Sequence, residues 1–434
     1  MIKSFKLLRK LFVFTFVLLC ASIALAQEKT LSLSEALEKT LDNNYGIVVS
    51  KKDIIIAEIT NSWEAAGRYP TIGFTASPSY RNEMVGENIT TMVSGSLSLN
   101  WTLFNGFRVQ ITKEKLDKLE ELSKGRSGVV IENAIQDVIL AYYNILLQKQ
   151  QLEVLNKLML LSKDRYDYEQ TKYEIGGSVT YNVLLAKNIY LEDKASYLNQ
   201  EVVVRNAVRN LNFLMGEQLA QEWEFTEKFE GETKEFILGD LMDKMMASNQ
   251  TLQNQYINLM LQQEEIKLQQ SSLYPRLSLN AGIGNAYSWY DPEIPTSANP
   301  VETLTPNGSL TLSYDIYAAG SRRRAVNIAK INEEIGTIET EQMKHSLSNQ
   351  LYNEFEMYNL RIELFNVANE SLEAAEMNLQ IAKEKFESGA INSFNYRDIQ
   401  LNYLNTALNQ LRSVYNLIYS NSTLTRLTGG FLNE

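Results

Sequence analysis

The residues that could support catalysis are few and lie far apart. The chain has one histidine, His345, and one cysteine, Cys20, and neither has neighbours at the spacing that metal binding or nucleophilic attack needs. Gly282-Ile283-Gly284 lies within a strand-like alternating segment and opens no helix, so it does not predict a dinucleotide-binding loop. The sequence therefore predicts no catalytic, cofactor-binding or metal site, and we do not expect an enzyme.

Charged residues instead gather near the ends of predicted elements. Asn395, Arg397 and Asp398 follow Gly389, a residue suited to ending a helix. Taken alone, Arg397 and Asp398 are typical of an exposed pair on a helix surface. Arg322-Arg323-Arg324 follow the last alternating segment and could be a solvated patch or lie near lipid head groups. The meaning of these residues depends on the elements that position them.

The second half of the chain repeats the first. Two motifs recur in the same order: Trp101–Arg108 returns as Tyr314–Arg322, and Tyr173–Gly176 returns as Phe386–Gly389. A repeat this long indicates two copies of one large structural unit rather than a solenoid of small ones. We assign the copies to residues 27–238 and 239–434, with a linker over 216–238 at the end of the first.

Residues 1–26 are predicted to be an export signal. Basic residues precede an apolar stretch, and Ala24-Leu25-Ala26 supplies a small-residue cleavage site. A lipoprotein signal would instead use Cys20, but Leu19 is larger than the residue normally found before a lipidated cysteine. Cleavage after Ala26 leaves no cysteine, which fits an oxidising compartment. The net charge of −11 argues against a nucleic-acid partner, which requires a basic face.

Long helices are predicted where proline is absent. All seven prolines fall in two short zones, and helix interiors exclude proline because it lacks an N–H donor. Apolar residues elsewhere recur at helical spacing, and the segments 106–176 and 320–389 would each extend roughly 100 Å as helix. Helices of about half that length are expected over four further segments: 32–66, 178–215, 239–272 and 391–427. A simple coiled-coil rod would also explain these segments.

The two proline zones have the period-two pattern of β-strands, in hairpins predicted over 70–104 and 276–317. We expect one row of side chains to face lipid: Leu97, Leu99, Trp101, Leu310, Leu312 and Tyr314. The other row would face a lumen: Ser98, Asn100, Thr311 and Ser313. A β-sandwich would alternate too, but serine-rich faces and aromatic strand ends in an exported chain favour a membrane barrel.

Four strands cannot close a membrane barrel by themselves. Even the smallest membrane barrels have about eight strands, and lipid does not tolerate an open edge. Oligomerisation is therefore expected if these strands enter a membrane. Three chains would supply twelve strands, which is wide enough to leave a lumen.

Together these features resemble the TolC-like outer membrane efflux protein family. The resemblance rests on the export signal, the duplicated unit, the strand exits Leu103–Gly106 and Ile316–Gly320, and the turns at Gly176 and Gly389. It implies a mainly α-helical fold, in which a long antiparallel coiled-coil bundle carries two β-hairpins per chain. A homotrimer would form a twelve-stranded β-barrel and an α-helical tunnel. It also implies docking to an inner-membrane transporter and a periplasmic adaptor protein.

The resemblance further implies a constriction on the helices that follow the two turn glycines. Family members commonly carry acidic residues six and nine positions after the second glycine, and these positions are Asn395 and Asp398 here. The chain thus departs from the more acidic family pattern and keeps only Asp398. We expect a periplasmic gate from five residues: Tyr181, Asn182, Asn395, Tyr396 and Asp398. An exposed surface pair remains the alternative for Asp398.

The expected function is a passive outer membrane exit duct of a tripartite efflux pump or type I secretion system. The duct would contact outer membrane lipids in a Gram-negative bacterium, with its helical body in the periplasm. A soluble periplasmic coiled-coil adaptor or scaffold is the alternative, because adaptors also carry helical hairpins. Adaptors need compact β-domains, whereas the strands here form hairpins between long helices, which favours the duct.

Overall fold

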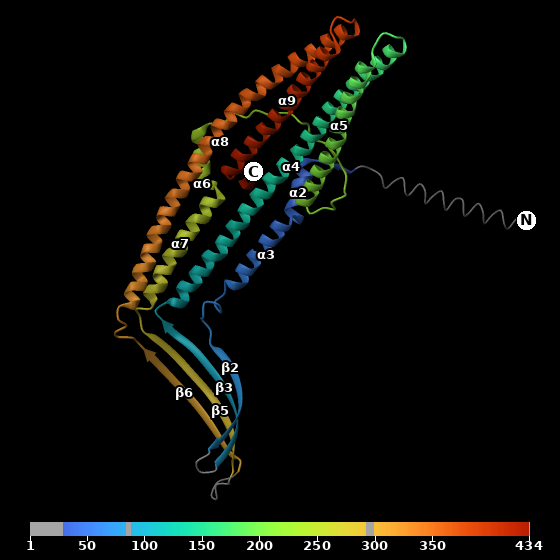
Figure 1. The fold of residues 1–434 in the computed structure, drawn as a ribbon. Coiled ribbons are helices and arrows are strands. Elements are labelled where there is room, and N and C mark those ends of the chain that lie inside the picture. Colours follow the sequence, from blue (N-terminus) through green and yellow to red (C-terminus); the bar gives the residue numbers. More distant parts are fainter. Residues whose placement is uncertain (1–28, 84–87, 292–298, 434) are drawn as a thin grey trace, which may run out of the picture. The chain divides into compact units, whose positions relative to one another are not determined.

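The computed structural model describes residues 29–83, 88–291 and 299–433, and it is mainly helical as expected (Figure 1). The predicted export signal over 1–26, with Cys20, lies outside the described residues. The chain forms two compact units. We call them the strand unit, from residues 50–129 and 250–346, and the turn unit, from residues up to 49, 130–249 and 347 onward.

The strand unit contains a four-stranded antiparallel sheet in the order β2-β3-β5-β6 (Figure 1). Its strands are β2 (Thr71–Glu83), β3 (Asn88–Asn105), β5 (Arg276–Asp291) and β6 (Val301–Ser313). Both expected hairpins are present, and pairing of β3 with β5 joins them into one sheet.

The predicted strand pattern is wrong at two positions. β6 ends at Ser313, so Tyr314 lies beyond it. Arg322, in the first turn of α8 (Ser321–Glu387), donates hydrogen bonds to the carboxylate and the backbone carbonyl of Asp315. The segment after Ser313 therefore contacts the start of α8 and does not extend the strand. In β3, the register shifts between Thr102 and Phe104, so Leu103 is a bulge that leaves the alternation.

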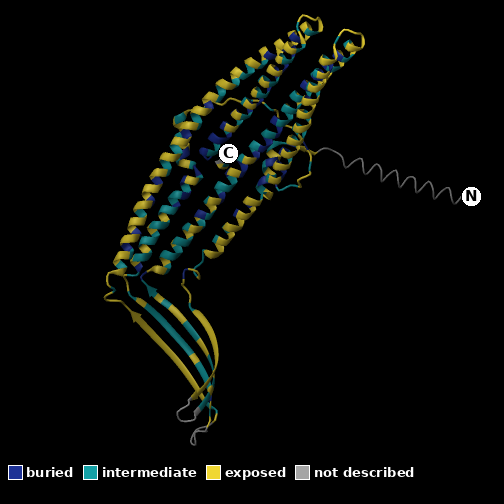
Figure 2. Cartoon of the chain, in the orientation of Figure 1, coloured by how far each residue is buried: buried dark blue, intermediate teal, exposed yellow. Residues whose placement is uncertain are grey.

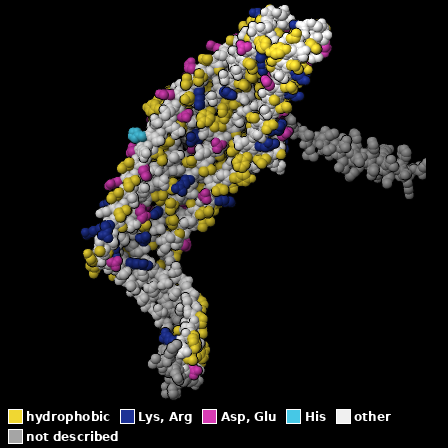
Figure 3. Space-filling view, in the orientation of Figure 1, with side chains coloured by type: hydrophobic (Ala, Val, Ile, Leu, Met, Phe, Trp, Pro, Cys, Tyr) yellow, Lys and Arg dark blue, Asp and Glu magenta, His cyan; other side chains and the backbone are white. Residues whose placement is uncertain are grey.

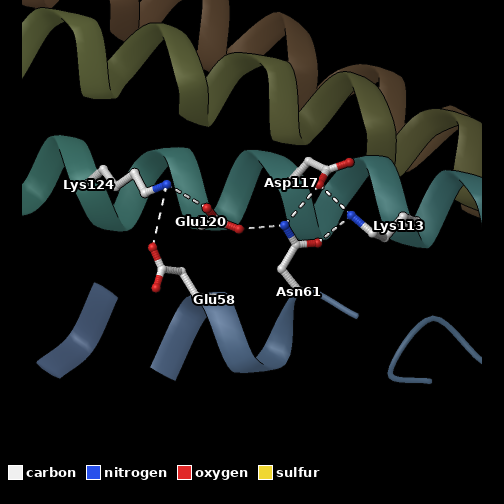
Figure 4. Close-up of polar contacts among 6 residues, drawn as sticks. All are labelled: Glu58, Asn61, Lys113, Asp117, Glu120 and Lys124. Carbon is white, nitrogen blue, oxygen red and sulfur yellow. Dashed lines mark hydrogen bonds and ion pairs between the residues drawn. The ribbon is translucent and has the colours of Figure 1, made fainter. Parts of the chain in front are cut away.

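Segments of four helices belong to the strand unit: α3 (Tyr45–Thr60), α4 (Arg108–Glu174), α7 (Gln250–Ser271) and α8. An amide at the end of α3 links it to α4 (Figure 4). Asn61 donates hydrogen bonds to Asp117 at 2.9 Å and Glu120 at 2.6 Å, and accepts one from Lys113 at 2.7 Å. The hydrogen bond from Lys113 lowers the pKa of Asp117, and that from Asn61 lowers the pKa of Glu120. This network fixes the point from which the chain leaves for β2.

The turn unit packs helices around apolar cores, where most buried residues lie (Figure 2). Its further elements are β1 (Lys29–Leu31), α2 (Leu33–Asn43), α5 (Thr180–Leu214), β4 (Trp223–Phe225), α6 (Leu238–Ser248), α9 (Ser393–Leu427) and α10 (Gly430–Asn433). One core centres on Tyr142 and Leu211, and another on Met245 and Tyr358. β1 and β4 pair in parallel, so the segment expected as a linker over 216–238 carries a short strand.

α4 passes the length and composition test for a membrane-crossing helix. Its most apolar window has a mean hydropathy of 1.2, and 39% of that window is buried within the chain. The same helix supplies Val138, Tyr142 and Ile145 to a core of the turn unit, which accounts for apolar side chains on one of its faces.

Two expected helices are each broken by an asparagine. The segments 32–66 and 239–272 instead form α2 with α3 and α6 with α7. Asn44 and Asn249 leave the helical conformation, with ψ angles of 125° and 115°. Each amide donates to the carbonyl of the last residue of a neighbouring helix: Asn44 to Leu214 at 2.8 Å and Asn249 to Leu427 at 3.0 Å. These long-range bonds satisfy carbonyls at helix ends. Asn44 also caps the start of α3, because its Oδ1 accepts from the backbone N–H groups of Gly46 at 2.9 Å and Ile47 at 3.2 Å.

A buried carboxyl in the turn unit should make its stability depend on pH. Glu132 is 5% exposed, and burial raises its pKa from 4.5 to about 7, against the opposing pull of Arg426. Between these two values the folded chain binds more protons than the unfolded chain, so stability falls as pH rises through the window. Asp137, whose pKa is also raised by burial, faces the same Arg426.

We therefore expect Glu132→Gln to raise the urea midpoint of unfolding at pH 8 and to leave it nearly unchanged at pH 4.5. The measurement is circular dichroism of the detergent-solubilised protein at both pH values. Glu356→Gln, at an exposed position on α8, is the matched control and should change neither midpoint. Equal stabilisation by Glu132→Gln at both pH values would contradict the raised pKa.

Candidate functional site

The sheet register sorts the strand side chains into two faces. Directly opposed residues share a face, so a row can be followed across all strands. Leu97 lies opposite Phe74 and Ile283, and Trp101 lies opposite Leu279, which in turn lies opposite Leu310. One face therefore carries five residues that the sequence groups together: Leu97, Leu99, Trp101, Leu310 and Leu312.

The opposite face is polar. Ser98 lies opposite Gly73 and Gly282, while Asn100 lies opposite Thr71 and Asn280. Thr311 and Ser313 continue this face on β6, opposite Ser278 and Arg276. Small hydroxyl and amide side chains thus lie on one face of the sheet and apolar side chains on the other. This alternation is typical of strands with lipid on one side and water on the other.

Nothing in the described strand unit covers the apolar face. Phe74, Leu310 and Leu312 are 73%, 63% and 69% exposed. The outer strands β2 and β6 each pair on one side only, which leaves backbone donors and acceptors open along both edges. Unpaired edges are places where another strand can add, and an exposed apolar face of this kind marks a surface for contact with protein or membrane.

The turn unit contains the two helix reversals at which the gate residues were expected. α4 ends at Glu174 and α5 begins at Thr180, while α8 ends at Glu387 and α9 begins at Ser393. Gly176 and Gly389 lie in these turns with φ of 78° and 76°, a left-handed conformation that favours glycine. Asn392 caps α9 by accepting a hydrogen bond from the backbone of Asn395 at 2.9 Å.

The expected gate residues fall into different environments. Tyr181 is 63% exposed, and Asn395 and Asp398 are exposed as well. Asn182 is half-buried and donates to Ser178 at 3.3 Å. Tyr396 is 4% exposed, and its ring stacks on that of Phe386 with 4.8 Å between the ring centroids, so its side chain lies in a core instead of at the surface. Tyr396 belongs to a core formed by residues of α8 and α9, against which Val154 and Leu161 of α4 pack.

Arg397 does not pair with Asp398. It donates to both carboxylate oxygens of Asp193 on α5, at 2.7 and 2.8 Å, and the two side chains are only 14% and 7% exposed. Within the described part of the chain, Asp398 forms no ion pair. Asp398 is therefore not part of a surface ion pair with Arg397. Its exposed carboxylate lies on α9, after the second helix reversal.

Arg165 completes a buried polar group that the sequence analysis missed. Its side chain is 3% exposed, and burial, with a further contribution from Arg397, lowers the pKa of its guanidinium. Glu169, one turn later on α4, accepts a hydrogen bond from Ser178 at 2.6 Å. A signal was present, because Arg165 follows Leu158 at the spacing of the apolar stripe, where an exposed arginine is not expected.

Comparisons with known proteins agree with this architecture. The chain matches the family model "Outer membrane efflux protein" over residues 36–217 and 241–430. No curated protein sequence matches it. The Campylobacter jejuni CmeC outer membrane channel is 16% identical, with a TM-score of 0.75 over 92% of this chain and 85% of that one.

Two further solved structures share the fold. VceC from Vibrio cholerae is 13% identical, with a TM-score of 0.71 over 92% of this chain and 96% of that one. The open state of the Neisseria gonorrhoeae MtrE outer membrane channel is 14% identical, with a TM-score of 0.70 over 92% of this chain and 89% of that one. At these identities the structures establish the fold, while the family match covers most of the sequence and indicates a channel family rather than an enzyme family. The chain therefore belongs to the outer membrane efflux protein family and is an exit duct of the outer membrane.

Proposed function

We propose that three copies of this chain close a twelve-stranded barrel in the outer membrane. The observation that carries the proposal is a sheet with one uncovered apolar face and two unpaired edges. β2 and β6 run antiparallel to each other across the sheet, so β6 of one copy can meet β2 of the next in the same antiparallel sense. At each junction, the β6 edge of one copy pairs with the β2 edge of the next. When the last copy pairs with the first, no strand edge remains unpaired.

The duplicated sequence supports two matching halves in each protomer, over 27–238 and 239–434. α4 and α8 each have 67 residues, α5 and α9 each have 35, and α2 and α6 each have 11. Two equal halves in each of three chains would give the helical body of the assembly near-sixfold regularity. A conduit built this way needs no catalytic group, because a partner supplies the energy.

Members of the family function with inner-membrane transporters and periplasmic adaptors, and we propose the same two classes of partner here. An adaptor or scaffold role for this chain is disfavoured, because a soluble protein would have to shield the apolar sheet face and both edges.

The oligomer can be tested on protein extracted from isolated outer membranes. Light scattering with the detergent contribution subtracted should give three times the mass of one processed chain. A protein recovered from the periplasm as a soluble monomer would contradict the proposal, as would a stable dimer or tetramer in several detergents.

We propose that Asp398 supplies a ring of three carboxylates at the closed end of the helical conduit. The support is its exposure beside the turn at Gly389 and the capture of its neighbour Arg397 by Asp193. Asn395 and Asn182 would add amides without charge, and the exposed Tyr181 would add bulk. Carboxylates brought together in a narrow passage attract cations and can hold a divalent ion.

Asp398→Asn is therefore expected to raise the Mg²⁺ concentration for half-block of single-channel current about tenfold, equivalent to ~1.4 kcal/mol of lost attraction. Asp398→Arg should reduce cation preference further, as a shift of the reversal potential in a KCl gradient. Glu384→Asn, which also removes an exposed carboxylate but lies on α8, is the control. If both Asp398 variants keep the block and the selectivity of the wild type, Asp398 is not part of the gate.

A further inference from the structure

A cavity of about 550 Å³ lies in the strand unit where the strands meet the helices. Arg108 from the start of α4, Arg276 from the start of β5 and Arg322 from the start of α8 all line it. Figure 3 shows Lys and Arg side chains gathered over the helix ends that adjoin the strands. Three arginines from three different elements thus converge on one hollow.

The cavity opens on the polar face of the sheet. Arg276 lies directly opposite Asn105 on β3 and Ser313 on β6, and both of these residues also line the cavity. The guanidinium of Arg276 donates to the hydroxyl of Thr102 at 3.3 Å, and Thr102 lies opposite Ser278 on that face. Arg276 therefore points to the same side as the small polar residues and away from the apolar face.

The positive charge of this cavity is only partly neutralised. Asp315 is the carboxylate among the lining residues, and it is paired with Arg322. In residues 29–83, 88–291 and 299–433, Arg108 and Arg276 form no ion pair, and both are exposed. Glu265 lies within electrostatic reach of Arg108 but is held by Lys115 at 2.7 Å. This excess of cations stands out in a chain whose net charge is −11.

The backbone around the cavity is rigidly placed. Gly106 precedes α4 with φ of 68°, and a Cβ at this position would lie 2.3 Å from the carbonyl oxygen of Ser271. The start of α4 therefore packs directly on the end of α7, which contributes Ser271 to the cavity lining. This contact fixes the backbone from which Arg108 extends.

We propose that Arg108, Arg276 and Arg322 form an anion-binding ring inside the lumen, at the helix-side end of the barrel, and that the duct favours cargo bearing phosphate, sulfate or carboxylate groups. The inference rests on the proposed function, because the polar face lines a lumen only when the barrel is closed. Guanidinium groups bind oxyanions through paired, charge-assisted hydrogen bonds. Three protomers would repeat the cluster around the passage, as charged rings do in anion-selective pores.

The test uses full-length trimers in planar bilayers of neutral phosphatidylcholine, with tripolyphosphate as the probe. It is added on the side of the hairpin loops, from which it reaches the ring through the barrel. Tripolyphosphate should reduce the wild-type current, and Arg276→Gln should raise the half-blocking concentration about tenfold, as expected for losing a charge-assisted hydrogen bond. Arg276→Lys keeps the charge but loses the paired hydrogen bonds, so its half-blocking concentration should lie between those of the wild type and Arg276→Gln. Arg323→Gln removes a neighbouring exposed cation that does not line this cavity and should match the wild type.

Superimposable block curves for wild type, Arg276→Gln and Arg108→Gln, in channels that conduct normally, would overturn the ring while leaving the duct intact. Wild-type protein that forms no conducting channel would instead overturn the proposed function. A second arm repeats the measurement with phosphatidylglycerol in the bilayer. An unchanged block supports a lumenal ring, whereas loss of the block means that the arginines face lipid head groups and overturns the assignment to soluble cargo.

Discussion

Replacing Asp193 with alanine is expected to lower the free energy of unfolding by about 3–5 kcal/mol, the usual cost of removing one partner of a buried ion pair. Asp193 accepts two hydrogen bonds from Arg397, and both side chains are largely shielded from water. Without the Asp193 carboxylate, the guanidinium groups of Arg397 and Arg165 would repel each other, and Glu169 would remain as a carboxylate close to Arg165. Their repulsion already contributes to the lowered pKa of Arg165, so the loss exceeds that of one hydrogen bond.

The measurement is urea unfolding of the detergent-solubilised protein, followed by circular dichroism at 222 nm. Asp398→Ala removes the same charge from an exposed position next to Arg397 on α9 and should change stability by less than about 0.5 kcal/mol. Replacing Asp193 and Arg397 together by leucine should restore much of the lost stability, because no charge is then stranded. Equal midpoints for Asp193→Ala and Asp398→Ala would mean that the pair does not hold α5 against α9.

The strand pattern could be predicted because its cause is local. A side chain alternates faces every residue, so Leu97, Leu99 and Trp101 had to share a face whatever their partners were. The sequence could not predict the bulge at Leu103 or the end of β6 before Tyr314. These depend on Arg322 reaching back to Asp315 and on the opposing strand, which are contacts between distant residues.

The long helices were predicted for the same local reason, and their turns are marked by Gly176 and Gly389. The breaks at Asn44 and Asn249 were not predicted. Asn44 offered a local signal, because asparagine favours helix caps and its Oδ1 accepts from the backbone N–H groups of Gly46 and Ile47 at the start of α3. The bonds from the two amides to the carbonyls of Leu214 and Leu427 join distant residues, which the sequence pattern could not reveal.

At the helix reversals, the sequence could place the proposed gate residues beside the two turn glycines, but it could not predict their environments. Asp398 and Tyr396 stand two positions apart, which places them on different faces of α9, one exposed and one in the core. Arg397 has its ion-pair partner on another helix, which a single-sequence pattern cannot reveal.

Leu310→Arg is expected to destabilise the membrane barrel by about 2–4 kcal/mol per chain if residue 310 lies near the bilayer midplane. Leu310 lies on the apolar face opposite Leu279 and is 63% exposed in the single chain, so the proposed barrel would place it in lipid. Thr311→Arg is the matched control on the polar face, where an arginine meets water. It should allow trimers to form and change mainly the conductance, while Leu310→Arg should reduce the yield of trimers in outer membranes.

Cysteine labelling decides the register independently of stability. In a Cys20→Ala background, Thr311→Cys should react with a membrane-impermeant maleimide and Leu310→Cys with a lipid-phase reagent. The opposite result would mean that the face assigned to lipid faces the lumen. Side chains alternate between the two faces, so a shift of one residue moves every apolar side chain to the other face. An inverted sheet would also turn Arg276 from the lumen toward lipid, since Arg276 shares its face with Thr311 and Ser313. The two positions on β6 therefore test the barrel wall and the environment of the arginine cluster together.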